Sequence, residues 1–476
     1  MIDLYLIDEV NVKFDGLTES DIDYIITNTK KYVKGYYNTS DFMLKLWDGK
    51  VSHFNEEGFT FYYMIQEVVP LLRVLGYDTD SDIEVHDFRE TYTKPEKIDD
   101  SFLVEHGIQL RWFQADAVNQ IIDHEKGIVA VATAGGKTRI SHCISKVYDS
   151  VGMKSIVITP NNKLVNQTYD EYVSGNMNVC KISEKDSRKK IVEKLETYDH
   201  VIGTFKKINN NRDLLEDKKY VLIWDECHIL GDVMANLLKN ELSECPIRIG
   251  LTGSLPKDNQ KKEKIFCHIG GDSLINLEAR ELIDMGYAAK EEIYMIKTNH
   301  KKFHQHFDQT KWTWRKEQAY MDNNKDRFYA IVKYLDSLPK ENTLVLCRNS
   351  IGNMLSTHYG IPFIDKDTST KNREELYDAF EVSDGEWLFA SFGTSATGIS
   401  INRIFQLVLI DVGKDSISII QSIGRGLRKD GIVNKVVIHD IYADSKYSLR
   451  HANERMSLYK KKKYNFTKAP DNQIIV

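Results

Sequence analysis

The chain has 476 residues, about three times the commonest domain length, so we expect two large domains and a small third one. Hydrophobic residues make up 42% and charged residues 28%, which is typical of a globular protein and excludes a membrane span. The net charge of −6 is unevenly distributed, because residues 1–100 carry 10 Lys and Arg against 21 Asp and Glu. The acidity is therefore concentrated in the first hundred residues.

The start of the chain and its cysteines indicate the compartment. MIDLYLIDEV has acidic residues where a signal peptide needs a basic region, so we expect a protein that is not secreted. The six cysteines form no CxxC pair, which argues against a disulfide framework and a cysteine-ligated zinc site and fits a reducing cytoplasm. No cluster of histidine and carboxylate residues has the spacing of a metal site.

Residues 1–100 are predicted to form a small α+β module. Alternating segments at 4–7 and 59–62 indicate short strands, and the apolar spacing over 65–75 indicates a helix. The stretch 92–100 contains a proline and three acidic residues, which is typical of a linker. We therefore expect the module to make few contacts with the rest of the chain.

Two series of strand-like runs follow, and each alternates with helical patterns, which predicts two parallel, doubly wound sheets in tandem. The runs of the first series are 127–132, 155–159, 200–203, 220–224 and 247–251, and those of the second are 343–347, 387–390, 406–410 and 435–441. The predicted domains are an acidic accessory domain at 1–100, an ATP-binding domain at 101–295 and a second α/β domain with a basic tail at 296–476.

The first run leads into TAGGKT at 133–138 and then into a helical stretch. A strand, a glycine-rich turn, a Lys-Thr pair and a helix are the context that a phosphate-binding loop requires. Small residues let backbone N–H groups approach the phosphates, Lys137 adds a positive charge there, and the Thr138 hydroxyl can bind Mg²⁺. The general pattern has a glycine where this chain has Val131, so the loop alone is an imperfect match.

Further along the first series, an apolar run ends in DECH at 225–228. A carboxylate at the end of a strand can bind Mg²⁺, and a second one beside it can orient and deprotonate the attacking water. We assign the first role to Asp225 and the second to Glu226. An exposed acidic turn is the alternative for an isolated Asp-Glu pair, but the upstream phosphate loop disfavours it.

Together, AGGKT at 134–138 and DECH at 225–228 resemble motifs of the superfamily 2 helicases. Other motifs of that family follow in order: RWFQ at 111–114 is similar to the adenine-reading element, TPN at 159–161 and GTF at 203–205 to strand-contacting motifs, and TGS at 252–254 to motif III. In the second half, 344–348 resembles motif IV, ASFGTSATGIS at 390–400 motif V, and QSIGRGLR at 421–428 motif VI.

The resemblance implies an α/β fold with two tandem RecA-like parallel-sheet domains behind the small α+β domain. It implies ATP and Mg²⁺ as cofactors, with the motif VI arginines reaching the γ-phosphate, so that hydrolysis depends on domain closure. The implied catalytic residues are Lys137, Asp225, Glu226, Gln421, Arg425 and Arg428. The implied ATP-binding residues are Arg111, Gln114, Ala134, Gly135, Gly136, Lys137, Thr138 and Gly398. Thr138 and Asp225 are the implied metal ligands.

Further residues are assigned to nucleic-acid binding and to coupling. The implied nucleic-acid contacts are Pro160, Asn161, Thr204, Arg348 and Thr394, and the implied coupling residues are His228, Thr252 and Ser254. Two positions depart from the family pattern. Ser400 stands where many relatives have an aspartate near the ATP ribose, which leaves the nucleotide selectivity open, and Ala134 replaces a usual glycine, where we expect any small residue to suffice.

Among subfamilies, the chain resembles the UvsW-type helicases of tailed bacteriophages. Four features carry this likeness: LWDGK at 46–50, ELIDMGY at 281–287, the GTSATGIS form of motif V, and the tail at 451–459. The likeness implies a monomeric DNA helicase that unwinds or branch-migrates forked DNA in phage recombination, repair and replication. It implies DNA and phage recombination or single-strand-binding proteins as partners, the host cytoplasm as location, and no membrane.

Several alternatives stay open at this point. An RNA helicase would use the same backbone-gripping motifs. The motor of a restriction enzyme is disfavoured because no separate nuclease domain is evident, and a nucleotide-gated binding protein because the catalytic set is intact. The aromatic residues Trp47, Tyr62, Tyr63, Trp312 and Trp314 could stack on bases or pack in the interior. The eight basic residues between 446 and 468 could bind a polyanion or form a solvated helix end.

Overall fold

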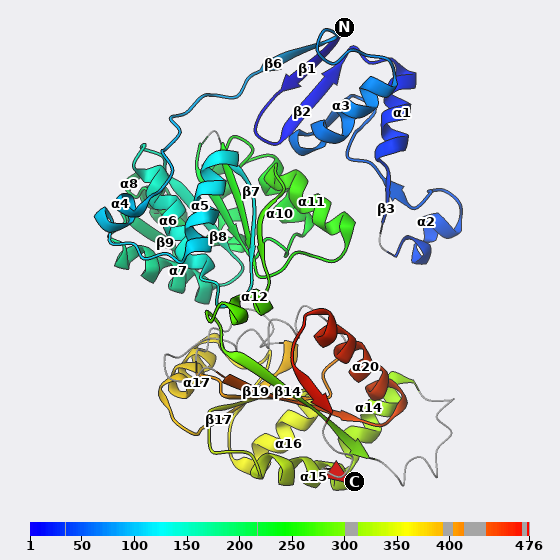
Figure 1. Cartoon of the computed structure of the whole chain (residues 1–476), viewed down its shortest axis with the longest axis vertical. Coiled ribbons are helices and arrows are strands. Elements are labelled where there is room, and N and C mark those ends of the chain that lie inside the picture. The colour runs from blue at the N-terminus through cyan, green and yellow to red at the C-terminus, as the bar shows by residue number, and fades with distance from the viewer. Residues whose placement is uncertain are drawn as a thin grey trace. The chain divides into compact units, whose positions relative to one another are not determined.

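A computed structural model describes residues 1–33, 35–216, 218–299, 313–393, 403–413, 435–468 and 474–475. The chain divides into two compact units, one of residues 1–131 with 136–276 and one of residues 132–135 with 277–476. Figure 1 shows the first unit in blue to green and the second in green to red. Among the described residues, no helix has both the length and the apolar character needed to cross a membrane.

The N-terminal module is built on a four-stranded sheet in the order β5-β2-β1-β6. β1 pairs antiparallel with β2 and parallel with β6, and β2 pairs antiparallel with β5. The strands are β1 (Ile2–Leu6), β2 (Asn11–Asp15), β5 (Phe59–Phe61) and β6 (Ile83–Asp87). Every second residue of β1 is buried, so one face of the sheet packs against α1 (Glu19–Thr29) and α3 (Ile65–Val74), which lie side by side in Figure 1.

A short segment leaves this module between α1 and β5. It holds the two-stranded pair β3 (Lys31–Tyr32) and β4 (Lys50–Val51) and the single-turn helix α2 (Ser40–Met43). Figure 1 shows the segment standing apart from the four-stranded sheet. We call residues 30–51 the protrusion.

The first large sheet has the strand order β13-β7-β12-β11-β8-β10-β9. Its strands are β7 (Lys126–Val131), β8 (Ser155–Thr159), β9 (Val179–Ile182), β10 (His200–Thr204), β11 (Val221–Asp225), β12 (Ile247–Thr252) and β13 (Ser273–Leu277). The strand pairs from β7 to β9 are parallel. β7, β8, β10 and β12 are buried at every position, which is typical of a parallel sheet covered on both faces.

The helices around this sheet are α4 (Asp100–Glu105), α5 (Trp112–His124), α6 (Lys137–Asp149), α7 (Asn162–Ser174), α8 (Arg188–Thr197), α9 (Phe205–Asn209), α10 (Asp232–Lys239) and α11 (Asn259–Ile269). Because the strands are parallel, their carboxyl ends meet at one edge of the sheet. We call this the carboxyl edge and the opposite one the amino edge.

The N-terminal module packs on the amino edge. Lys126, the first residue of β7, lies with its Nζ 2.5 Å from a carboxylate oxygen of Glu9, and both residues are buried. A small apolar cluster also joins Val10, Phe61 and Met64 of the module to Cys267 of α11. The expectation that the module makes few contacts is therefore wrong. A linker motif predicts an exposed chain and gives no information about side chains that meet from distant parts of the sequence.

The predicted linker is itself held in place. The backbone N–H of Ile98 donates to the Asn119 side chain at 2.8 Å, and the Asn119 amide donates back to the Ile98 carbonyl at 3.1 Å. Ile98 is buried, and Lys97 pairs with Asp123 at 2.7 Å. These contacts fasten the stretch to α5.

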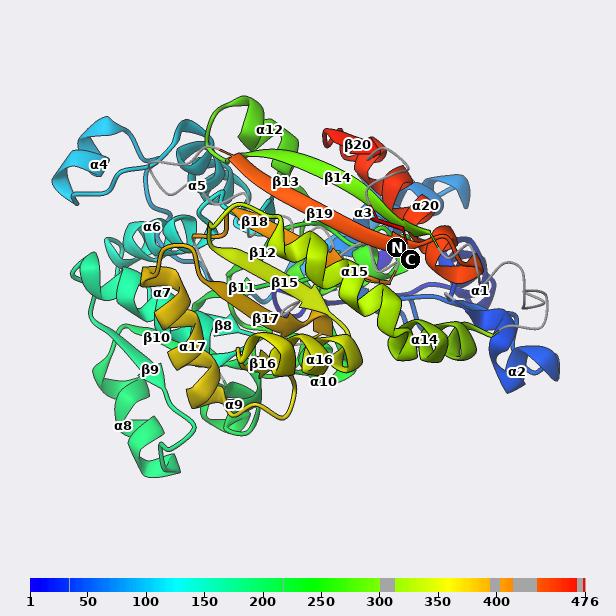
Figure 2. The same cartoon turned by 90° about the horizontal axis from the view of Figure 1, so that it is seen from below.

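The second unit contains α12 (Ala279–Asp284) and a sheet in the order β16-β17-β15-β18-β19-β14-β20, with β21 paired to β14. Its strands are β14 (Lys290–Asn299), β15 (Thr343–Cys347), β16 (Phe363–Ile364), β17 (Trp387–Ser391), β18 (Gln406–Ile410), β19 (Lys435–Ala443), β20 (Phe466–Lys468) and β21 (Ile474–Ile475), joined in parallel pairs. Its remaining described helices are α14 (Trp314–Asn323), α15 (Lys325–Asp336), α16 (Asn349–Tyr359), α17 (Thr370–Val382) and α20 (Lys446–Lys461). Figure 2 shows α15 and α16 over β15 and β17, where they share an apolar core.

Two ambiguous segments of the second unit pack against its interior. Trp314 begins α14 and lies with its ring 4.6 Å from that of His451 on α20. Arg455 of the basic tail is buried and makes a two-pronged ion pair with Asp440, at 2.6 and 2.8 Å. Part of the basic run is therefore structural.

The predicted fold class is confirmed: two large parallel-sheet domains of the RecA-like type follow a small α+β module. The domain boundaries stay predictions.

Candidate active site

The phosphate loop connects β7 to α6 at the carboxyl edge. The N–H of Gly135 donates to the Ala132 carbonyl at 3.0 Å and closes a turn, and Gly136 precedes α6 with a φ of 77°. Lys137 and Thr138 open the helix, whose first N–H groups and positive dipole end suit a phosphate. Ala134 has a φ of 72°, in the region that favours glycine, so the expectation that a small side chain is the sole requirement there is wrong.

The predicted adenine-reading residue lies against this loop. Gln114 is buried, and its side-chain oxygen accepts the Arg111 N–H at 2.8 Å at the start of α5. Its amide nitrogen lies so close to Gly136 that a Cβ there would clash with it. The structure therefore brings Arg111, Gln114 and the phosphate loop together.

The acidic pair ends β11 at the same edge. A Glu226 carboxylate oxygen lies 3.8 Å from the Lys137 Nζ, and the Glu226 backbone has a φ of 54° in the left-handed region. Such a conformation costs about 1–3 kcal/mol and is concentrated at active sites. Burial opposes the Glu226 charge, but Lys137 and His228 outweigh it and hold the pKa of Glu226 below its usual value. Glu226 is therefore ionised, as a base for water activation must be.

Asp225 lies in a different electrostatic environment. Its carboxylate accepts the Glu226 N–H at 2.9 Å, and burial together with the Glu226 charge raises its pKa. A divalent cation beside Asp225 would offset both effects. The Asp225 carboxylate and the Thr138 hydroxyl are oxygen donors of the kind that Mg²⁺ prefers, so these residues fit the metal.

The three predicted coupling residues form a chain of contacts that reaches Glu226, the predicted base. His228 Nδ1 lies 3.2 Å from a Glu226 carboxylate oxygen and 3.0 Å from the Thr252 hydroxyl. The Thr252 hydroxyl donates to the Ser254 carbonyl at 3.0 Å. The carboxyl end of β12 is thus linked to Glu226 through a single histidine.

The predicted nucleic-acid residues of the first unit lie at neighbouring strand ends. β8 and β10 pair in register so that Thr204 lies opposite Thr159, and Pro160 and Asn161 follow directly. Asn161 caps α7 by accepting the Leu164 N–H at 3.0 Å, and Thr204 caps α9 by accepting the Lys207 N–H at 3.3 Å. Each side-chain oxygen accepts a hydrogen bond from its own helix, an arrangement that does not use the Asn161 amide N–H groups or the Thr204 hydroxyl hydrogen, which are the donors that a phosphate would accept from.

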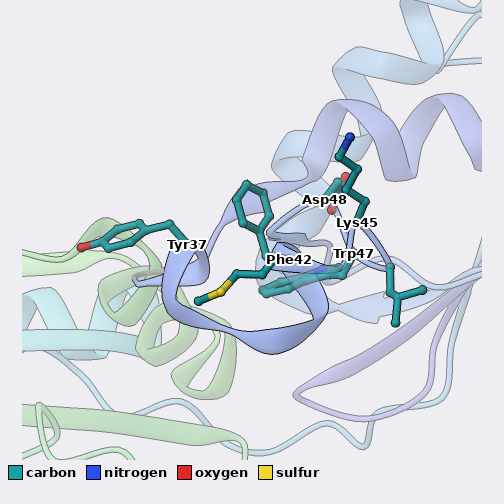
Figure 3. A pocket seen from close by; sticks show the side chains of 7 residues that line it. Tyr37, Phe42, Lys45, Trp47 and Asp48 are labelled. Carbon is teal, nitrogen blue, oxygen red and sulfur yellow. The ribbon is translucent and has the colours of Figure 1, made fainter.

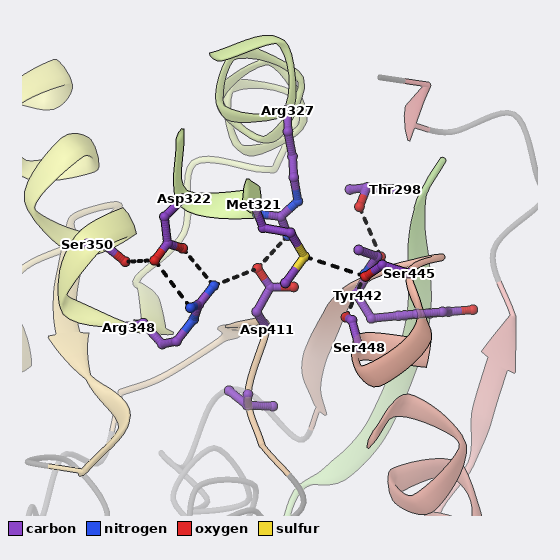
Figure 4. Close-up of polar contacts among 12 residues, drawn as sticks. Thr298, Met321, Asp322, Arg327, Arg348, Ser350, Asp411, Tyr442, Ser445 and Ser448 are labelled. Atoms are coloured by element: carbon purple, nitrogen blue, oxygen red, sulfur yellow. Dashed lines mark hydrogen bonds and ion pairs between the residues drawn. The ribbon is translucent and has the colours of Figure 1, made fainter. Parts of the chain in front are cut away.

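Arg348, the predicted contact of the second unit, is held by carboxylates. Its Nη2 lies 2.7 Å from Asp322 and 3.7 Å from Asp411. Asp411 also accepts a hydrogen bond from the buried Arg327 at 2.5 Å (Figure 4). The structure thus places Arg348 in an ion-pair network directly after β15 and β18.

Several predicted residues lie outside the described part of the chain. They are Thr394, Gly398, Gln421, Arg425 and Arg428, together with Ser400 and Trp312. Their assignments stay predictions.

Arg139 lies beside the site and was not predicted from the sequence. Its Nε lies 2.5 Å from Glu171 on α7, and its Nη1 donates to the Gln109 carbonyl at 3.4 Å. It therefore ties the helix of the phosphate loop to α7 and to the segment before Arg111. Its position directly after the Lys-Thr pair was the available signal.

A group with metal-binding chemistry was also missed, in the N-terminal module. Asp3 of β1 pairs in register with Glu84 of β6, and His86 lies on the same strand, with all three ligand atoms within 4.8 Å of one another. Asp3 is more than eighty positions from Glu84 and His86, so spacing could not reveal the group. His86 Nε2 lies 2.8 Å from Asp3, a contact that an ion pair explains without a metal.

Comparisons with known proteins agree with this site. Residues 107–257 match the family model described as "Type III restriction enzyme, res subunit". The chain is 22% identical over 479 aligned residues to the "ATP-dependent DNA helicase uvsW" of Enterobacteria phage T4, covering 91% of this chain and 92% of that protein. It is 26% identical over 206 residues to the "DNA 3'-5' translocase XPB2" of Sulfurisphaera tokodaii, covering 42% of this chain and 43% of that protein. A solved structure titled "The crystal structure of T4 UvsW" aligns with a TM-score of 0.47 at 19% identity, covering 100% of this chain and 99% of that one.

The family match spans the phosphate loop and the acidic pair, and the alignment to the phage relative covers 91% of this chain. The resemblance recognised from the motifs is thereby confirmed: the chain is similar to ATP-dependent DNA helicases of the UvsW type.

Proposed function

We propose that this helicase unwinds or branch-migrates forked and branched DNA in phage recombination, repair and replication, acting as a monomer in the host cytoplasm. The observation that carries the proposal is the arrangement of residues at the carboxyl edge of the first large sheet. The chain of contacts from Lys137 through Glu226 and His228 to Thr252 lies on the same edge as the strand ends that carry Asn161 and Thr204. Nucleotide chemistry and strand contact therefore share one rigid sheet.

In the proposed reaction Glu226 accepts a proton from the water that attacks the γ-phosphate, while Lys137 neutralises charge on the phosphates. Mg²⁺, when bound through Thr138 and Asp225, supplies further charge neutralisation. His228 holds Glu226 in position and links it to Thr252. The resemblance assigns the γ-phosphate contacts from the second unit to Arg425 and Arg428, and a catalytic role to Gln421.

The protrusion is the proposed contact with branched DNA. Residues 30–51 carry five lysines and two aspartates, so this segment is basic although residues 1–100 as a whole are acidic. Five of its large apolar side chains are well exposed: Tyr32 by 55%, Tyr37 by 61%, Met43 by 65%, Leu44 by 67% and Leu46 by 75%. Exposed aromatic groups among lysines can stack on unpaired bases and attract phosphates.

Trp47 has a supporting role in this arrangement. Its indole N–H donates to the Lys50 carbonyl at 2.6 Å, and the ring lines a hollow with Tyr37, Phe42 and Met43 (Figure 3). The Lys50 Nζ lies 4.7 Å from the Tyr32 ring centre. Trp47 therefore shapes the hollow, and a base would stack on the more exposed Tyr37.

The test is the ATPase rate with single-stranded DNA, single-stranded RNA, duplex DNA and a four-way junction at one salt concentration, because salt alone shifts affinity strongly. We expect the junction and single-stranded DNA to stimulate turnover most. Equal or greater stimulation by RNA would replace the proposal with an RNA helicase. Tyr37→Ala should reduce stimulation by the junction more than stimulation by single-stranded DNA.

A further inference from the structure

Two helices of the first unit link the nucleotide and the nucleic-acid positions. α6 begins with Lys137 and Thr138 of the phosphate loop, and α7 begins directly after Asn161. Both helices follow parallel strands of one sheet, so both start at the carboxyl edge. Because the two helices are in contact, a change that ATP causes at the start of α6 can reach Asn161 if the helices move together.

The hydroxyl of Tyr172 on α7 is buried between these helices and is fully hydrogen-bonded. It donates to the Ser141 carbonyl at 3.0 Å, and its oxygen lies 2.8 Å from the hydroxyls of both Ser141 and Ser145. A phenol has one proton and two lone pairs, so with its proton on the carbonyl the two serines must donate to it. Burial raises the pKa of Tyr172, so the hydroxyl keeps its proton.

Other side chains pack closely around this network. The His142 ring lies 5.5 Å from the Tyr172 ring, and a Cβ on Gly175 would clash with it. Arg139 adds an ion pair to Glu171 at the rim of the same interface. Apolar helix faces can slide past each other by small steps, whereas a saturated buried network is broken by such a step.

We infer that Tyr172 is a positioning residue that makes α6 and α7 move as one body and so couples ATP binding to nucleic-acid affinity. This inference rests on the proposed function. Within the first unit, the coupling between ATP and nucleic acid then depends on the Tyr172 hydroxyl and on Ser141 and Ser145. These groups act in addition to the His228–Thr252 contact.

The experiment compares Tyr172→Phe with Tyr148→Phe. Tyr148 is a buried tyrosine of α6, and its hydroxyl has no hydrogen-bond partner within the described residues, so it is a matched control. Affinity for single-stranded DNA is measured with and without a non-hydrolysable ATP analogue, and the ratio is the coupling factor. Basal ATPase and the melting temperature are measured in parallel.

We expect Tyr172→Phe to lower the coupling factor at least about fivefold, the low end of typical allosteric couplings, while basal ATPase changes less than twofold. Tyr148→Phe should leave the factor unchanged. If Tyr172→Phe does not fold, Ser141→Ala with Ser145→Ala carries the same test, because it removes the two donors and keeps the ring. A wild-type coupling factor in both Tyr172→Phe and the double serine variant would overturn the inference, whether or not the melting temperature falls. A wild-type protein whose DNA affinity ignores the nucleotide would instead overturn the proposed function.

Discussion

The two edges of the first large sheet are built in opposite ways. At the carboxyl edge, Ala134 and Glu226 hold left-handed backbone conformations, and the Lys137 charge lies 3.8 Å from Glu226 rather than in direct contact. At the amino edge, Lys126 contacts Glu9 at 2.5 Å, donates to the Glu9 carbonyl at 3.1 Å and lies 4.1 Å from the Tyr62 ring centre. The carboxyl edge therefore has a strained backbone and charges that are not in direct contact with each other. At the amino edge, by contrast, the charge of Lys126 is neutralised by a neighbouring side chain.

Arg248, near the start of β12, is a second charged residue of the amino edge that is satisfied within the protein. The residue is fully buried and donates to the carbonyls of Leu238 and His268, each at 2.8 Å, and to that of Leu242. Burial lowers its pKa, and the carbonyls supply hydrogen bonds in place of a carboxylate. A buried cation with several acceptors fixes the local geometry and leaves little for a ligand to gain.

The largest effect should follow from removing the N-terminal module. A chain that starts near Ser101 would lose Glu9 and Tyr62 from Lys126 and would expose the apolar surface around Cys267. We expect poor solubility or a large drop in melting temperature, because a buried charge loses its partner and an apolar patch meets water.

The measurement is the soluble yield and the thermal unfolding of the shortened chain beside the full chain. A well-folded shortened chain with wild-type basal ATPase would contradict the structural role of the amino edge. It would restore the view of a module attached through a linker alone.

The next effect concerns the carboxyl edge. Glu226→Gln should lower ATP turnover about a hundredfold or more, because the amide cannot accept the proton of the attacking water. ATP affinity should be retained, and the melting temperature should change little, because the loss of the Glu226 attraction to Lys137 and His228 is offset by the loss of its repulsion of Asp225. Turnover is measured at saturating ATP, with affinity from a fluorescent nucleotide. Wild-type turnover would remove Glu226 from the mechanism.

A smaller effect is expected at the amino edge, where a substitution should lower stability without changing ATPase activity. Lys126→Met should destabilise the protein by about 2 kcal/mol, less than for an isolated buried pair, because Arg89 still lies 3.4 Å from Glu9. ATPase per folded molecule should not change. Denaturant unfolding measures the first quantity. Lys239→Met is the control, since Lys239 lies on the exposed side of the same interface, 5.1 Å from the Phe61 ring centre.

The two edges also differ in what the sequence reveals. The strands of β7, β8, β10, β11 and β12 and the residues of the loop and acidic pair follow from local patterns, because a phosphate site needs adjacent residues on one turn. β9, β13, β14 and the shorter strands of the second unit were not predicted. The Glu9–Lys126 pair was not predictable either, since its partners are 117 positions apart and neither belongs to a motif. The left-handed backbone at Glu226 has no sequence signal, because glutamate rarely adopts it.

The smallest predicted effect is a pH dependence at the amino edge. His268 of α11 is buried against the Phe61 ring, 4.8 Å away, and its Nδ1 donates to the Lys264 carbonyl at 2.7 Å. Burial lowers its pKa from 6.5 to about 4, with smaller contributions from Lys264, Arg248 and His53, although the hydrogen bond to the carbonyl opposes the shift. Below pH 6.5 the unfolded chain therefore binds a proton that the folded chain excludes.

Stability must fall as the pH drops from 6.5 towards 4 and should level off below that range. At about pH 5.5 the loss from this one group should be about 1 kcal/mol. His268→Gln can keep the donation to the carbonyl but cannot take up a proton, so its unfolding free energy should decline less over the same range than that of the wild type. The comparison is made by denaturant unfolding between pH 7.5 and 5, where the difference between the two proteins cancels the other titrating groups. Parallel pH profiles would mean that the amino edge admits enough water to solvate the imidazolium, and the contrast with the carboxyl edge would then rest on Lys126 and Arg248 alone.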